Sequence, residues 1–160
     1  MGKNFDTFDW DDITELKTVS SEHCNQLDVD LQEFRRLKQS YPGRLKAIRY
    51  EDGAMDPLEY TAGIYTFLGL EVTDDVRRYV TDITSASKER FRDTNQPYSV
   101  KRSDPVQTMQ SWRYNTTFEH ASAVDSQCSH LYTALGYRVV QSQEDLLSNR
   151  TLITQMDTDL

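Results

Sequence analysis

The stretch that decides the fold is Arg49-Tyr50-Glu51-Asp52-Gly53-Ala54-Met55-Asp56-Pro57-Leu58, which continues to Tyr65-Thr66-Phe67-Leu68-Gly69-Leu70. Arg49 and Tyr50 are the last residues of the run Leu45–Tyr50. In this run Leu45 and Ala47 alternate with Lys46 and Ile48, and this period of two predicts a β-strand. Asp56-Pro57 predicts the start of a helix, because proline is tolerated in the first turn, and Gly69 predicts its end. The stretch therefore predicts a strand, an acidic turn and a helix in direct succession.

Further helices are predicted on both sides of this stretch. Upstream, apolar residues at helical spacing follow a cap at Ser20 or Ser21 and stop at Tyr41-Pro42-Gly43. Downstream, helices are expected after Thr73, from Asp104-Pro105 to Trp112, and from Phe118 to Leu135 with Gly136 as the stop. Residues 84–101 are typical of a loop. Because one strand cannot form a sheet, we expect its partner strands to lie outside this sequence.

Length and charge limit the classes of protein to consider. The 160 residues fit one domain, and the formal net charge of −8 argues against a nucleic-acid partner. The longest stretches without a charged residue, Tyr60–Leu70 and Ser126–Tyr137, are shorter than the roughly 20 residues of a membrane span. The first residues contain no apolar signal region, so the chain taken literally is cytoplasmic. We expect an irregular leader at 1–19, a domain at 20–140 and a polar tail at 141–160.

Few residues carry the signature of chemistry. The sequence lacks the glycine-rich phosphate loops and the usual zinc and nucleophile motifs, so we expect no metal. Cys24 and Cys128 are either two buried thiols or one long-range disulfide. The pair Glu51-Asp52 could serve acid–base chemistry after the strand, although helix and loop capping is the favoured interpretation.

Positive charges gather in the second half of the chain. Arg102 and Arg113, with Ser103 and Trp112 nearby, combine cations, a hydroxyl and an indole, a set that suits a phosphorylated nucleotide. The alternative is a solvated basic loop ahead of an amphipathic helix whose Trp112 is in the core. Spacing alone favours this alternative.

The ordered motifs resemble those of one family. The stretch quoted first resembles the RYEDL-x-x-DP…Y-x-FLGL segment of sulfotransferases. Ser99–Ser103 followed by Ser111-Trp112-Arg113 resembles the S/T-x-R-x-S…WR stretch of the Golgi carbohydrate 6-O-sulfotransferases. Cys128 with Leu135-Gly136-Tyr137-Arg138-Val139 is similar to their C…LGYR-x-V. The resemblance covers roughly residues 20–140, which would form part of a sulfotransferase domain.

The resemblance implies a fold and an activity. The family fold is a P-loop-like α/β domain, of which this chain would be a C-terminal fragment, mostly helical with one or few parallel strands. The family transfers sulfate from 3′-phosphoadenosine 5′-phosphosulfate to N-acetylglucosamine, galactose or N-acetylgalactosamine of a glycan acceptor. Its members are usually membrane-anchored in the Golgi lumen. A homodimer is a further expectation.

The resemblance also assigns roles to residues. It implies cofactor binding by Tyr50, Arg102, Ser103 and Arg113. It makes a Cys24–Cys128 disulfide plausible in an oxidising lumen. In that compartment Asn115 and Asn149, each followed by a threonine two positions later, become glycosylation candidates. No catalytic residue is assigned.

One departure from the family pattern leaves the activity open. The 5′-phosphosulfate loop, an R-[ST]-G-S-S-like turn into a helix, is absent from this sequence. We therefore expect a chain without the donor-binding half, either as part of a sulfotransferase or as an inactive remnant that binds a partner. An unrelated helical interaction domain would require the motif matches to be coincidental.

Overall fold

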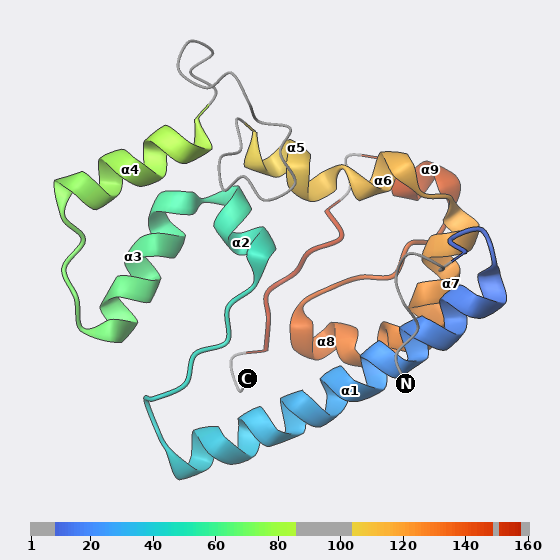
Figure 1. Cartoon of the computed structure of the whole chain (residues 1–160), viewed down its shortest axis with the longest axis horizontal. Coiled ribbons are helices and arrows are strands. Elements are labelled where there is room, and N and C mark those ends of the chain that lie inside the picture. Colours follow the sequence, from blue (N-terminus) through green and yellow to red (C-terminus); the bar gives the residue numbers. More distant parts are fainter. Residues whose placement is uncertain (1–8, 86–103, 149–150, 158–160) are drawn as a thin grey trace. The chain divides into compact units, whose positions relative to one another are not determined.

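The computed structural model describes residues 9–85, 104–148 and 151–157 (Figure 1). Its helices are α1 (Ile13–Ser40), α2 (Tyr50–Met55), α3 (Pro57–Leu68), α4 (Asp74–Thr84), α5 (Pro105–Gln110), α6 (Trp112–Asn115), α7 (Phe118–Cys128), the 3-10 helix η2 (Ser129–Leu131), α8 (Tyr132–Leu135) and α9 (Gln143–Leu147). The fold is mostly helical, as predicted. The chain divides into two compact units, one from residues up to 46 and from 113 onward, the other from 47–112.

Several helix ends follow the predicted signals. The Asp56 carboxylate accepts a hydrogen bond from the Glu59 amide at 3.0 Å and caps α3, which ends at Gly69 in the left-handed conformation (φ 69°). The Thr73 hydroxyl caps α4 by accepting from the Val76 amide at 3.3 Å. These helix ends are predictable from the sequence because each depends on one residue and the helical turn next to it.

The start of α1 differs from the prediction. Asp12, rather than Ser20 or Ser21, is the N-cap, and its Oδ1 accepts from the amides of Thr14 and Glu15 at 2.8 and 3.2 Å. Residues 13–19, expected to be irregular, are therefore helical. The helical spacing already begins at Leu16, which is buried. The end of α1 at Tyr41 agrees with the predicted stop.

The strand prediction for Leu45–Tyr50 is wrong. Residues 45–49 have no regular secondary structure, and Tyr50 begins α2. The alternation itself is real, since Arg49 is buried while Ile48 and Tyr50 are exposed. Within the described ranges, the only β-pairing is an isolated antiparallel bridge between Tyr137 and Ile153. The mostly helical part of the fold prediction is therefore observed, whereas its parallel strands are not seen among the described residues.

The end of the chain forms more separate helices than predicted. The expected helix 118–135 is α7, η2 and α8 in succession, and Gly136 (φ 71°) ends it. Part of the expected polar tail 141–160 forms α9, where Leu146 is fully buried at 0% exposure. The prediction of a loop at 84–101 falls almost wholly outside the described residues.

In the first unit, which comprises residues up to 46 and from 113 onward, the core forms where α7 packs against the segments that follow it. Its buried side chains are Ala121, Val140, Leu146 and Leu152, with Phe118 packed against them. Helix α1 lies along α7 (Figure 1). Four apolar side chains from four places in the sequence thus fix the C-terminal half of this unit.

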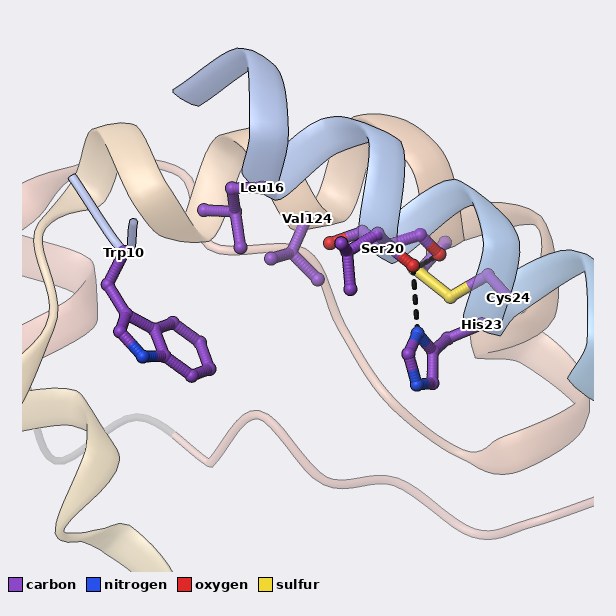
Figure 2. A pocket seen from close by; sticks show the side chains of 8 residues that line it. Trp10, Leu16, Ser20, His23, Cys24 and Val124 are labelled. Carbon is purple, nitrogen blue, oxygen red and sulfur yellow. Dashed lines mark hydrogen bonds between the residues drawn. A yellow bond between two sulfur atoms is a disulfide. The ribbon is translucent and has the colours of Figure 1, made fainter. Parts of the chain in front are cut away.

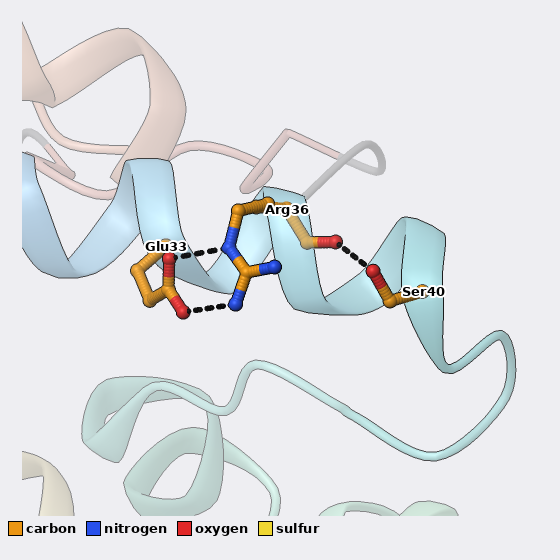
Figure 3. A network of polar contacts seen from close by, with 3 residues as sticks. All are labelled: Glu33, Arg36 and Ser40. Carbon is orange, nitrogen blue, oxygen red and sulfur yellow. Dashed lines mark hydrogen bonds and ion pairs between the residues drawn. The ribbon is translucent and has the colours of Figure 1, made fainter.

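The far end of α1 is an ordinary solvated surface. Arg36 donates to both carboxylate oxygens of Glu33, at 2.7 and 2.6 Å, and its carbonyl accepts from the Ser40 hydroxyl at 3.1 Å (Figure 3). This hydrogen-bonded ion pair lowers the pKa of Glu33. Because both side chains are exposed, the pair contributes little to stability. Among the described helices, none has both the length and the apolar composition for a membrane span.

Candidate functional site

Arg113, a predicted nucleotide ligand, is built into the first unit. The residue is only 5% exposed. Its Nε donates to the carbonyl of Leu146 at 2.7 Å, and Nη2 donates to the carbonyls of Asp145 and Ser148 at 3.0 and 2.8 Å. The guanidinium therefore caps the C-terminal end of α9, where helix carbonyls lack partners. A contact between Arg113 and the nucleotide stays a prediction.

Tyr50 lies in the second unit, at the start of α2. Its side chain is 58% exposed, as access to a ligand requires. Arg102 and Ser103 lie outside the described residues, and so does Asn149. Tyr50 and Arg113 belong to different units. The expected convergence of Arg102 and Arg113 on the side of Tyr50 therefore stays a prediction.

Asp52, one of the two acidic residues after Tyr50, has a structural partner. Asp52 Oδ1 lies 2.5 Å from Nη2 of Arg49, whose side chain is 7% exposed. Gly53, one residue later, packs under the ring of Tyr60, because a Cβ placed on it would lie 3.0 Å from two ring carbons. Burial, together with the charge of Asp52, raises the pKa of Tyr60. The ion pair with Arg49 favours a structural role for Asp52 over acid–base chemistry.

Cys24 and Cys128 form a disulfide between α1 and the end of α7. Their Cα atoms are 5.4 Å apart, within the distance that a disulfide requires. The pairing that the family resemblance implied is thus present in the structure. It joins two helices that are 104 positions apart in the sequence.

A pocket of about 260 Å³ lies beside this disulfide (Figure 2). It is lined by Trp10, Leu16, Val19, Ser20, His23, Cys24, Val124 and Cys128. Nδ1 of His23 donates to the Val19 carbonyl at 2.9 Å. The lining is almost wholly apolar and contains no arginine or lysine, so it does not suit a phosphorylated nucleotide. Sequence reasoning missed this pocket because it treated residues 1–19 as irregular.

Asp125 is a second feature that sequence reasoning missed. One carboxylate oxygen accepts from the Tyr132 hydroxyl at 2.6 Å, and the other accepts from the Val140 amide at 2.8 Å. The rings of Tyr132 and Tyr137 meet edge to face at 6.1 Å. Burial and the hydrogen bond to Asp125 raise the pKa of Tyr132 far above its ordinary value. Asp125 thereby fixes the path of the chain through Gly136.

The described residues contain no cluster of three histidine, cysteine or acidic side chains that could hold a metal ion. Three polar centres in this part of the chain are the Arg113 cap, the Arg49–Asp52 pair and the Asp125 anchor. All three hold backbone or neighbouring side chains in place.

Comparison with known proteins finds relatives that are all carbohydrate sulfotransferases. Carbohydrate sulfotransferase 1 of Rattus norvegicus is 27% identical over 135 residues, which are 84% of this chain and 31% of that protein. Carbohydrate sulfotransferase 1 of Danio rerio is 30% identical over the same share of this chain and 30% of its own length. Carbohydrate sulfotransferase 5 of Mus musculus is 32% identical over 118 residues, 72% of this chain and 29% of that protein.

No protein-family profile and no solved structure matches the chain. The relatives nevertheless all carry the name of the family that the motifs resemble. The length matched is consistent with a C-terminal fragment. The chain therefore belongs to the carbohydrate sulfotransferase family, and it spans less than a third of the length of the relatives it matches.

Proposed function

We propose that this chain is part of a carbohydrate sulfotransferase. The observation that carries the proposal is the match to carbohydrate sulfotransferases over 84% of the chain. The donor would be 3′-phosphoadenosine 5′-phosphosulfate and the acceptor a sugar hydroxyl of a glycan. In the reaction the sulfur–oxygen bond to the donor phosphate breaks, a bond to the sugar oxygen forms, and the hydroxyl proton leaves. Cations near the leaving phosphate would stabilise its charge.

We propose that the donor-binding half and the P-loop-like sheet belong to polypeptide beyond this sequence. The absence of the phosphosulfate motif from all 160 residues supports this. Helix α3 supports it independently, because it has one charged residue and no buried one. Leu58 and Leu68, on one stripe of α3 with Tyr65, are 41% and 57% exposed. A helix of this composition normally packs inside a protein.

The nucleotide would be held by Tyr50, Arg102, Ser103 and Arg113, as the family motifs suggest. The Cys24–Cys128 disulfide supports placement in the oxidising Golgi lumen, because structural disulfides are rare in the cytosol. The alternative is an inactive remnant that serves as a binding module. Arg113 favours this alternative in one respect, since its guanidinium already binds three carbonyls of the chain itself.

The test is sulfate transfer from labelled donor to a panel of sugar acceptors. The chain alone should transfer nothing and bind the donor at millimolar affinity at best. Co-expressed with the part of carbohydrate sulfotransferase 1 that it does not match, it should form a complex that transfers sulfate. Turnover by the chain alone would contradict the missing-half proposal, and an inactive complex would favour the remnant.

A matched pair of variants locates the pairing surface. Leu68→Glu places a charge on the exposed stripe of α3 and should abolish co-purification of the two pieces. Leu27→Glu changes an exposed leucine of α1 in the other unit and should leave co-purification intact. Equal loss in both variants would indicate that α3 is not the surface involved.

A further inference from the structure

Asn115 lies at an exposed turn between two inward-facing residues. It is the last residue of α6 and is exposed, as is Tyr114 before it at 65%. Arg113 is buried in its cap on α9, and Phe118 packs against the core cluster. The turn is thus held from both sides by inward-facing residues, while Asn115 is exposed.

The sequence of this turn, Asn115-Thr116-Thr117, is an acceptor pattern for N-linked glycosylation. In the structure Thr117 is also the N-cap of α7, and its Oγ1 accepts from the His120 amide at 3.3 Å. The same oxygen lies 2.5 Å from Nδ1 of His120. The next amide, of Phe118, donates to Oε1 of Gln143 at 2.8 Å. The hydroxyl that defines the acceptor pattern is therefore part of the folded helix start.

We propose that Asn115 carries an N-linked glycan and receives it before Thr117 caps α7. A bond forms between Nδ2 of Asn115 and the anomeric carbon of a lipid-linked oligosaccharide. The bond from that carbon to the lipid diphosphate breaks, the amide loses one proton, and the lipid diphosphate leaves. The inference rests on the proposed function, because this donor meets only chains that enter the secretory pathway.

The order of events follows from the double use of Thr117. Enzymatic recognition of the pattern needs the threonine hydroxyl beside the asparagine amide in an accessible backbone. Once α7 has formed, that hydroxyl is occupied at the helix start, and the disulfide at Cys128 holds the other end of α7 to α1. Transfer to the unfolded chain therefore precedes capping and disulfide formation.

Four variants of the natural protein, expressed with an epitope tag in its own cells, separate the two uses of Thr117. Asn149→Gln is added throughout to remove the second acceptor pattern. Asn115→Gln removes the acceptor and keeps the cap. Thr117→Asp removes the pattern but keeps a strong N-cap, and Thr117→Ser keeps both. We expect the parent and Thr117→Ser to carry one glycan more, removable by a glycosidase, than Asn115→Gln and Thr117→Asp.

Alkylation of free thiols in the same samples distinguishes failure of the glycan inference from failure of the proposed lumenal function. No glycan on a parent whose cysteines are oxidised would overturn the inference and leave the proposed lumenal function standing. No glycan and reduced cysteines would overturn both. Equal numbers of glycans in the parent and in Asn115→Gln would also overturn the assignment.

The order is tested with microsomes that contain the glycosyl-transferring enzyme. Unglycosylated parent, refolded with its disulfide, should accept less than a tenth of the glycan that the reduced, unfolded chain accepts. Equal transfer to both forms would overturn the proposed order.

Discussion

The hydroxyl of Tyr132 donates to the Asp125 carboxylate at 2.6 Å, and the same carboxylate holds the Val140 amide. One acidic side chain of α7 therefore holds both a side chain and the backbone of the segment that returns after Gly136. Tyr132 keeps its proton more strongly in the folded state than in the unfolded state, because burial and the Asp125 charge disfavour the phenolate.

Alkaline pH should weaken the fold through Tyr132. Its pKa is raised in the folded state, so its contribution is complete below the ordinary value of 10.0 and is lost as pH rises above that value. Tyr132→Phe should lower the free energy of unfolding at neutral pH by about 1–3 kcal/mol, since Asp125 loses a partner. The variant should also show a smaller loss between neutral pH and pH above 10. Denaturant unfolding at several pH values measures both effects. If the unfolding free energy of the two proteins fell equally with rising pH, the assignment would be contradicted.

Arg113 should behave as a structural residue. Arg113→Ala removes a guanidinium that serves three carbonyls, and we expect a loss of at least about 2 kcal/mol of unfolding free energy. Arg113→Lys should recover little, because one ammonium cannot reproduce the planar fork. Hydrogen exchange of the amides in α9 should accelerate in both variants. The exposed Arg138→Ala is the control, and stability equal to that of the parent in Arg113→Ala would refute the cap.

The disulfide should be a main source of stability in the first unit. Its loop of 104 positions corresponds to about 4–5 kcal/mol by loop-closure entropy. Replacing Cys24 and Cys128 together by alanine should lower the unfolding free energy by up to that amount. Reductant should then affect the parent but not the double variant. A parent that is insensitive to reductant would show that the bond adds no stability.

Two glycines offer substitutions with opposite expected signs. Gly63→Ala in α3 meets no heavy atom within 4 Å, so it should stabilise by about 0.5–1 kcal/mol through helix propensity. Gly53→Ala in α2 gains the same propensity but brings its Cβ to 3.0 Å from the Tyr60 ring. We expect it to be destabilising. Thermal melts of both variants test the pair, and equal stabilisation would show that the ring yields without cost.

The sequence predicted those parts of the fold that depend on neighbouring residues. The caps at Asp56 and Thr73 and the stops at Tyr41 and Gly69 each rest on one residue and the adjacent helical turn. The alternation before Tyr50 was also real, but the strand was not, because a ladder depends on a second backbone that alternation does not specify.

The candidate site was predictable only where a family motif named it. The disulfide partners came from the resemblance, whereas the role of Arg113 depends on carbonyls 32–35 positions away. Asp125 likewise binds an amide 15 positions away. Long-range pairs of this kind leave no periodic signal, so neither anchor could be recognised from spacing.

The Cys24–Cys128 bond turns residues 24–128 into a covalent ring, and the whole second unit, residues 47–112, lies on that ring. A protease that cuts once anywhere in the second unit opens the ring without releasing a fragment. The nicked protein would keep its mass until the bond is reduced, when it would separate into two pieces. The first unit thus has two connections between its halves, one through the peptide chain and one through sulfur.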